Sequence, residues 1–214
     1  MKLVDLTVRE FIHEVDSAAP APGGGSVSAL SAALGASLLR MVGHLTIPKK
    51  KFNKLDESVQ KDFIKIHENA KSIHTKLLDL IDRDTDAFNA IMNAYKLPKD
   101  SESDQSKRQK AIESATIKAI EVPLAIAELA AQALETADFI LKYGNKNTIS
   151  DIGVSVLTLY GGLEGACLNI LINLPGLSDE ELIKQFKTKA EDLINKATPI
   201  KQAVLEQVHQ HLNT

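Results

Sequence analysis

The sequence predicts an all-α protein, a single-domain bundle of long antiparallel helices that spans residues 1–214. Hydrophobic residues recur every three or four positions along most of the chain, which is the period of a helix with one buried face. Capping-box patterns mark helix starts, and the turn signals typical of β-hairpins are absent. A hydrophobic content of 44% in 214 residues is enough for one sizeable core.

The composition argues against several classes of partner. A net charge of -3, with both signs mixed along the chain, gives no general case for nucleic acid or a membrane surface. The single cysteine, Cys167, excludes an internal disulfide framework and fits a reducing compartment. The N-terminus lacks the basic and then apolar layout of a signal peptide, and polar residues interrupt the most apolar stretch, residues 27–45. We therefore expect a cytoplasmic protein.

The helices are expected in a definite order. Thr7 and Glu10 form a capping box for the first, and Ser178 and Glu181 form another for the last. Pro123 either ends a helix or kinks it, and Thr148 or Ser150 is the expected cap of a later one. The periodicity places helices at residues 8–18, 26–47, 56–95, 108–122, 124–141, 151–174 and from about 179 onward.

The most informative segment is Pro20-Ala21-Pro22-Gly23-Gly24-Gly25-Ser26, which opens onto an alanine- and serine-rich helix. Glycines permit positive φ angles and let a ligand approach the backbone, and the first N–H groups of a helix carry its positive dipole end. No Gly-Lys-Ser/Thr follows, so the segment is not a nucleotide-binding P-loop. The segment is thus either the floor of a ligand site or a plain interhelical linker.

One acid interrupts the apolar stripe of the helix expected at residues 56–95. Asp84 occupies a position where the stripe predicts a leucine, whereas Asp82 and Asp86 point mostly elsewhere. An inward carboxylate must be paired, protonated or functional, because burying it without compensation costs several kcal/mol. The alternative is a partly solvated acid near the helix end.

Two further faces are candidates for close contact or for a cleft. A strip of small residues on the second helix, formed by Ser28, Ser31, Ala32, Gly35 and Ala36, fits either an intramolecular helix or a second subunit. The helix expected at 151–174 has a polar and small face, and its Asn169 and Asn173 favour a wet cleft because buried amides need many hydrogen bonds.

The remaining polar groups suggest no metal centre. The metal-binding spacings of histidine and cysteine are absent, and His67, His74, His209 and His211 are expected on the solvated surface. Lys49, Lys50 and Lys51 are either a solvated charge run or, beside a cleft, the attractor of a polyanion such as a chain of glutamates. Taken together, these features suit a polar, anionic, heterocyclic ligand and acid–base chemistry without a metal.

Several of these motifs, in this order, resemble the cyclodeaminase family, which comprises the cyclodeaminase half of formiminotransferase-cyclodeaminase and its free-standing bacterial relatives. The resemblance spans nearly the whole chain. It rests on the glycine segment through Val27, Asp82-x-Asp84-x-x-Ala87-Phe88, Leu97-Pro98, Val122-Pro123-Leu124, Gly144-Asn145 with Ser150-Asp151, and Asn169-Ile170-Leu171-Ile172-Asn173.

The resemblance implies a homodimer that binds a reduced folate as its substrate, with sites near the subunit contact and with neither metal nor cofactor. It implies a 5-formiminotetrahydrofolate cyclodeaminase, a 5,10-methenyltetrahydrofolate cyclohydrolase or, in another class, a non-catalytic folate-binding subunit. Asp84 is the first candidate for proton transfer, followed by Asp82 and Asp151. The expected substrate-binding residues are Pro22, Gly23, Gly24, Gly25, Ser26, Lys49, Lys50, Asn145, Ser150, Asn169 and Asn173.

Overall fold

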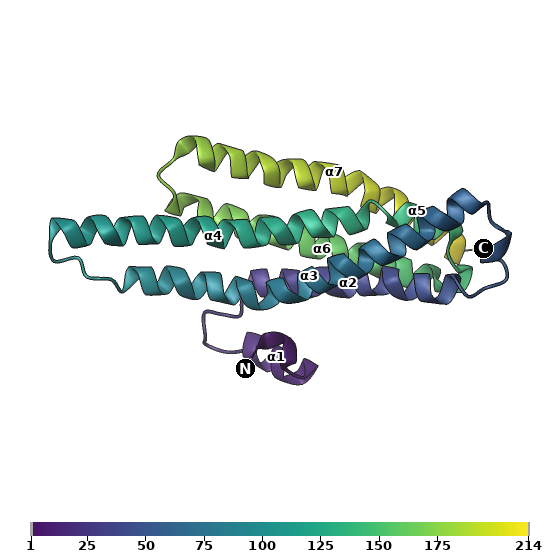
Figure 1. The fold of residues 1–214 in the computed structure, drawn as a ribbon, viewed down its shortest axis with the longest axis horizontal. Coiled ribbons are helices and arrows are strands. Elements are labelled where there is room, and N and C mark those ends of the chain that lie inside the picture. Colours follow the sequence, from purple (N-terminus) through teal and green to yellow (C-terminus); the bar gives the residue numbers. More distant parts are fainter. Residues whose placement is uncertain (1, 214) are drawn as a thin grey trace.

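The computed structural model describes residues 2–213 and confirms the all-α prediction, since these residues form helices and turns but no strand. Figure 1 shows long helices side by side in one elongated bundle, with the short α1 outside it. The α-helices are α1 (Val8–Val15), α2 (Gly24–Thr46), α3 (Glu57–Tyr95), α4 (Glu102–Leu134), α5 (Ala137–Tyr143), α6 (Ile149–Asn173) and α7 (Glu180–Leu212).

The helix α6 covers the small-residue strip of α2. A side chain at Gly162 would lie 2.7 Å from the carbonyl oxygen of Ser28, so the two backbones are in direct contact. Two hydroxyls bridge the same contact: Ser155 donates to the carbonyl oxygen of Gly35 at 2.7 Å, and Ser31 donates to that of Thr158 at 2.8 Å. The strip is therefore covered within one chain, and it is not by itself a reason for a second subunit.

Several local predictions need correction. The capping box of Thr7 and Glu10 is present, but Asp179 caps α7 and Ser178 donates instead to Glu113. Thr148 precedes α6 without a capping hydrogen bond from its side chain. Pro123 lies inside the continuous helix α4, so of its two alternatives only the one in which a helix ends there is wrong.

His67 was expected on the surface and is instead buried, with 6% of it exposed. Its ring fits against α2 because Gly43 has no side chain, and it lies edge-to-face with His44. The heptad spacing of His67 and His74 indicates a shared helix face, but it does not say whether another helix covers that face.

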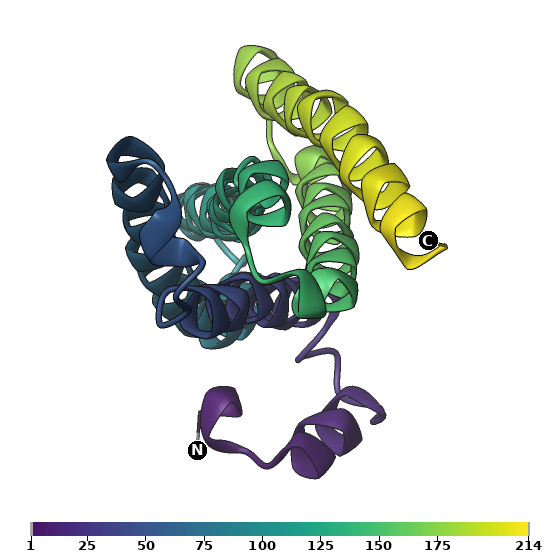
Figure 2. The same cartoon turned by 90° about the vertical axis from the view of Figure 1, so that its right-hand side faces the viewer.

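The helices α2 and α6 are each long and apolar enough to cross a membrane by length and composition alone. In the bundle they pack against each other and against α3 and α4 respectively. Their outer sides nevertheless keep large apolar residues exposed, and we call this surface the apolar face: Val27, Leu34 and Leu45 from α2, and Val154, Leu157, Leu168 and Ile172 from α6. Figure 2 shows α1 standing below α2, apart from the bundle.

The two neighbouring glycines Gly161 and Gly162 test the contact between α2 and α6. A methyl group at Gly162 would meet backbone atoms of α2, so Gly162→Ala should lower the free energy of unfolding by about 1–3 kcal/mol. A methyl group at Gly161 would have its nearest neighbour 3.9 Å away, so Gly161→Ala should be neutral or stabilising by up to about 1 kcal/mol. Chemical denaturation of both variants checks this, and equal losses of stability would contradict the close contact.

Candidate functional site

The first turn of α2 meets α3 at Asp84. Ser26 is fully buried there, and its hydroxyl donates to the carbonyl oxygen of Ile81 at 2.9 Å. The same hydroxyl oxygen lies 3.1 Å from Oδ2 of Asp84 and 3.2 Å from Oγ1 of Thr85. The carboxylate that interrupts the apolar stripe is thus placed at the N-terminus of the neighbouring helix.

This placement depends on Gly25. A side chain there would overlap the carboxylate of Asp84, and its Cβ would lie 2.6 Å from Oδ2. No described glycine has a positive φ, and Gly23 precedes α2 in an extended conformation, so the freedom of glycine to adopt positive φ is not used here. Gly25 is needed because two helices come close together, not because the backbone turns sharply.

Burial raises the pKa of Asp84 above its ordinary value, and hydrogen bonds from the hydroxyl and the backbone N–H of Ser26 partly oppose that rise. A carboxyl group with a raised pKa can accept and return a proton nearer neutral pH. The positive end of the α2 dipole therefore already faces a carboxylate. Asp84 stands where an anionic ligand was expected, so this turn suits a group that exchanges a proton with the carboxylate.

Asn169 comes from α6 to the same place. A side chain at Gly24 would lie 3.1 Å from its Nδ2, which donates to the carbonyl oxygen of Gly165 at 2.8 Å. Asn169 also lines an open hollow of about 510 Å³ with Leu168, Leu171 and Ile172. We call Gly24, Gly25, Ser26, Asp84 and Asn169 the acid end.

Asn173 lies one turn further along α6. Its Nδ2 donates to the carbonyl oxygen of Asn169 at 2.8 Å and lies 3.4 Å from that of Ala119 in α4. The wet-cleft prediction therefore applies only to this end of α6, because the middle of the same helix face packs tightly on α2.

Asp82 has a different partner from Asp84. Its Oδ1 accepts a hydrogen bond of 2.6 Å from the backbone N–H of Leu3. This bond holds the N-terminal 3-10 turn, Leu3–Asp5, against α3. Asp82 is about 200° around the helix from Asp84, so the two carboxylates serve different sides of α3.

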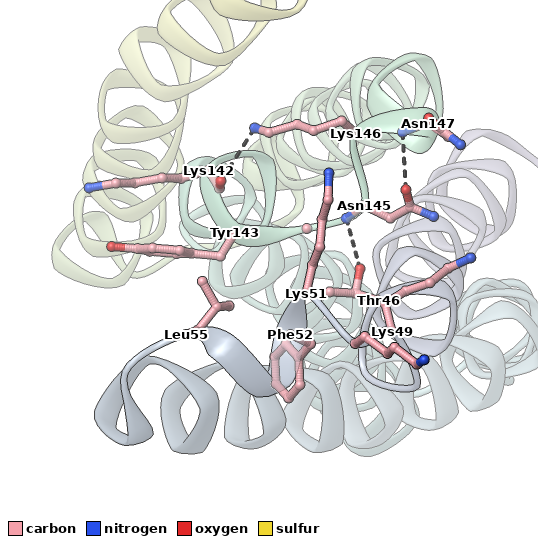
Figure 3. Close-up of a pocket in the computed structure, with 12 residues that line it drawn as sticks. Thr46, Lys49, Lys51, Phe52, Leu55, Lys142, Tyr143, Asn145, Lys146 and Asn147 are labelled. Atoms are coloured by element: carbon pink, nitrogen blue, oxygen red, sulfur yellow. Dashed lines mark hydrogen bonds between the residues drawn. The ribbon is translucent and has the colours of Figure 1, made fainter.

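The lysines predicted to bind substrate line a separate cavity of about 640 Å³ at the other end of α2 (Figure 3). Asn145 lines it too, with its backbone N–H donating to Oγ1 of Thr46 at 2.9 Å and its Nδ2 to the carbonyl oxygen of Leu45 at 3.2 Å. The cavity has five lysines and no acidic residue: Thr46, Lys49, Lys50, Lys51, Phe52, Leu55, Lys142, Tyr143, Gly144, Asn145, Lys146 and Asn147. We call it the basic end.

Four further residues line this cavity that were not among the predicted site residues: Lys142, Tyr143, Lys146 and Asn147. The signal was available, because all four flank the Gly144-Asn145 motif in a polar turn. What the sequence did not show is that this turn lies beside the end of α2, where Thr46 fixes it.

The two ends are far apart within one chain. Gly24 and Thr46 are the first and last residues of α2, which puts them about 33 Å apart at 1.5 Å per residue. Ser150 and Asp151 lie in the first turn of α6, and Asn169 lies about 27 Å further along that helix. A single chain therefore presents two separate groups of predicted site residues.

The comparisons with known proteins assign the family. The family model described as Formiminotransferase-cyclodeaminase matches residues 7–192. The chain is 35% identical over 207 residues to the methenyltetrahydrofolate cyclohydrolase of Methylorubrum extorquens, a match that covers 97% of this chain and 98% of that protein. It is 34% identical over 195 residues to the formimidoyltransferase-cyclodeaminase of Rattus norvegicus, covering 91% of this chain but only 35% of the rat protein.

The fold agrees with a solved structure. The crystal structure of formiminotetrahydrofolate cyclodeaminase from Thermotoga maritima superposes with a TM-score of 0.85 at 27% identity, covering 97% of this chain and 98% of that one. The chain therefore belongs to the formiminotransferase-cyclodeaminase family. It is an enzyme of the cyclodeaminase and cyclohydrolase type, as the sequence motifs predicted.

The raised pKa of Asp84 makes a prediction about stability. Because the pKa of Asp84 is raised in the folded state, its contribution to the free energy of unfolding is fully present below the ordinary aspartate range. This contribution is lost as the pH rises through the folded-state pKa. Asp84→Asn removes this loss and keeps an oxygen acceptor for Ser26. The melting temperature of the variant minus that of wild type should thus be more positive at about pH 7 than at about pH 4.

The exposed Asp86, two residues away on the same helix, gives the matched control. Asp86→Asn reports what the loss of a surface carboxylate does over the same pH range. If Asp84→Asn shows the same pH dependence as Asp86→Asn, burial does not disfavour the charge of Asp84.

Proposed function

We propose that this protein is a 5-formiminotetrahydrofolate cyclodeaminase, which releases ammonia and forms 5,10-methenyltetrahydrofolate. The observation that carries the proposal is the half-buried carboxyl group of Asp84, held against the first turn of α2 beside an amide from α6. The family supports the choice of substrate, since the named relatives act on formimino- or methenyltetrahydrofolate.

The proposed reaction is a transfer of protons between nitrogens. The aryl nitrogen attacks the carbon of the protonated formimino group on the neighbouring pterin nitrogen, which closes a five-membered ring and leaves an amino group on that carbon. The attacking nitrogen loses its proton, the amino group gains one, and ammonia departs to leave the methenyl cation. Asp84 would accept the first proton as a carboxylate and deliver a proton to the leaving nitrogen, a role typically worth ~100-fold to 10,000-fold in rate.

The same site supports a second candidate, a 5,10-methenyltetrahydrofolate cyclohydrolase. The observation in its favour is the full-length match to the free-standing cyclohydrolase of Methylorubrum extorquens. In this reaction water attacks the methenyl carbon, Asp84 accepts one proton of the water, and the pterin nitrogen takes the other as its bond to that carbon breaks, which opens the ring to the 10-formyl form. Both reactions share the methenyl cation, and they differ only in whether ammonia leaves or water enters.

We further propose that the complete site forms between two copies of the chain. The acid end and the basic end are about 33 Å apart along α2. The acid end has no lysine to bind a glutamate tail, and the basic end has no carboxylate for proton transfer. A second copy packed antiparallel against the apolar face would place its basic end beside the acid end of the first. The exposed apolar side chains support this arrangement, because a surface of this kind is typical of a subunit contact.

In the proposed assembly the lysines of the basic end meet the glutamate tail of the folate. The pterin would lie at the acid end, where Asn169 offers an amide to its polar edge. This division agrees with the charges, since the acid end already holds a carboxylate and the basic end has only cationic and neutral side chains.

The test of function is a pair of substitutions on α3. Asp84→Asn should lower turnover by ~100-fold or more, while folate binding survives, because shape and polarity are kept and the proton acceptor is lost. Asp82→Asn is the matched control two residues away and should cost less, since Asp82 binds the backbone of Leu3. Activity is followed by the methenyl chromophore with both candidate substrates.

Release of ammonia from 5-formiminotetrahydrofolate by wild type would support the cyclodeaminase. Consumption of 5,10-methenyltetrahydrofolate without ammonia-releasing activity would support the cyclohydrolase instead. Equal turnover of wild type and Asp84→Asn on both substrates would contradict the role given to Asp84.

Mixing two inactive variants tests whether the site is shared between copies. Asp84→Asn removes the acid end, and the double substitution Lys49→Glu, Lys50→Glu removes the basic end. After joint refolding, mixed dimers would have one intact site, so roughly a quarter of wild-type activity should return. Sedimentation should show a dimer at micromolar concentration. A monomer, or a mixture as inactive as its parts, would contradict the shared site.

A further inference from the structure

A third cavity, of about 250 Å³, lies on the outer side of the contact between α2 and α3. Its lining consists of Ser37, Arg40, Met41 and His44 from α2 and of His74 from α3. It is distinct from both ends of the proposed folate site. His44 is about 200° around α2 from Thr46 of the basic end, and Arg40 is about 22 Å along α2 from Gly25.

The positive charge of Arg40 has no counter-ion. Among residues 2–213, no carboxylate lies within ion-pair distance of its guanidinium group. Its Nε is buried and has no hydrogen-bond acceptor. A buried donor without a partner costs about 1–3 kcal/mol, more for a charged group, and such donors in proteins are usually satisfied by a water or an ion.

Two histidines, His44 and His74, line the cavity beside Arg40. His44 lies edge-to-face with the buried His67, with 4.5 Å between the ring centroids, so packing fixes its ring. Burial and then the charge of Arg40 lower the pKa of His74. The pKa of His67 is lowered by burial first and then by His44 and Arg40, whereas Glu68 raises it.

We propose that this cavity binds a small anion, an oxyanion such as phosphate or the carboxylate of an organic acid. Arg40 supplies the permanent charge and charge-assisted hydrogen bonds, Ser37 can donate its hydroxyl, and His44 and His74 donate from the rim. Ser37 donates to the carbonyl oxygen of Ala33 at 2.7 Å, and its hydroxyl can rotate toward the cavity. Phosphate and carboxylate share the oxygen acceptors that a guanidinium group prefers.

The site is expected to bind more tightly at lower pH. The titratable and charged groups around the cavity are Arg40, His44, His67, His74 and Glu68. Protonation of His74 adds positive charge next to Arg40, and a bound anion compensates that charge. Glu68, on the same helix as His67, raises the pKa of His67 and opposes the effect of Arg40 there.

Isothermal titration calorimetry of the full chain tests the proposal, with inorganic phosphate in one arm and glutarate in the other, at constant ionic strength. Arg40→Gln should weaken binding by ~10-fold to 100-fold, the value of a charge-assisted hydrogen bond. Arg108→Gln is the matched control. Arg108 already donates to the carbonyl oxygen of Tyr95 at 3.2 Å and lies over its ring, so this variant should bind like wild type.

His74→Gln provides a second variant if Arg40→Gln fails to fold, and it should abolish the tightening of binding at lower pH. Tighter binding of phosphate than of glutarate would identify the oxyanion as the ligand, and the reverse would identify the carboxylate. Binding of neither anion by wild type would overturn the proposal, and so would equal affinities of wild type, Arg40→Gln and His74→Gln. No turnover is measured, so the result is independent of which reaction the enzyme catalyses.

Discussion

The structure depends on one close approach, the contact of Asp84 with the first turn of α2. Gly25 makes it possible, because any side chain at that position would displace the carboxylate. The contact fixes the start of α2 on α3, and the same helix then meets α6 through Gly35 and Gly162. Glycines thus set the spacing of the three helices that carry the candidate site, although none of the described glycines has an unusual backbone conformation.

This contact lowers the stability of the fold, but it provides a carboxyl group that can transfer protons. A half-buried carboxylate with a raised pKa weakens the fold at neutral pH, and the hydrogen bonds from Ser26 recover only part of the loss. A leucine at this position would complete the apolar stripe of α3, whose neighbouring turns carry Leu77 and Leu80. A stripe broken by one acid beside a helix N-terminus is the pattern expected where a protein keeps a group for proton transfer.

Much of the fold and part of the site could be predicted from the sequence. The periodicity gave the long helices, and the break in the stripe identified Asp84 as inward-facing. Periodicity shows which face of a helix is buried but not what covers it. For that reason the partner of the small-residue strip on α2 was left open, and the prediction that His67 lies on the surface was wrong. The separation of the acid and basic ends followed from the length of α2 itself, yet the substrate-binding residues were predicted as one undivided set.

The most direct test of the central claim is a ¹³C NMR titration of the aspartate carboxyl groups, with the Asp84 signal assigned by its absence from Asp84→Asn. The account predicts that Asp84 titrates above the ordinary aspartate value of about 3.9 and that its signal shifts when tetrahydrofolate is added. An Asp84 that titrates in the ordinary range and does not respond to the folate would contradict the claim that this residue is the proton-transfer group.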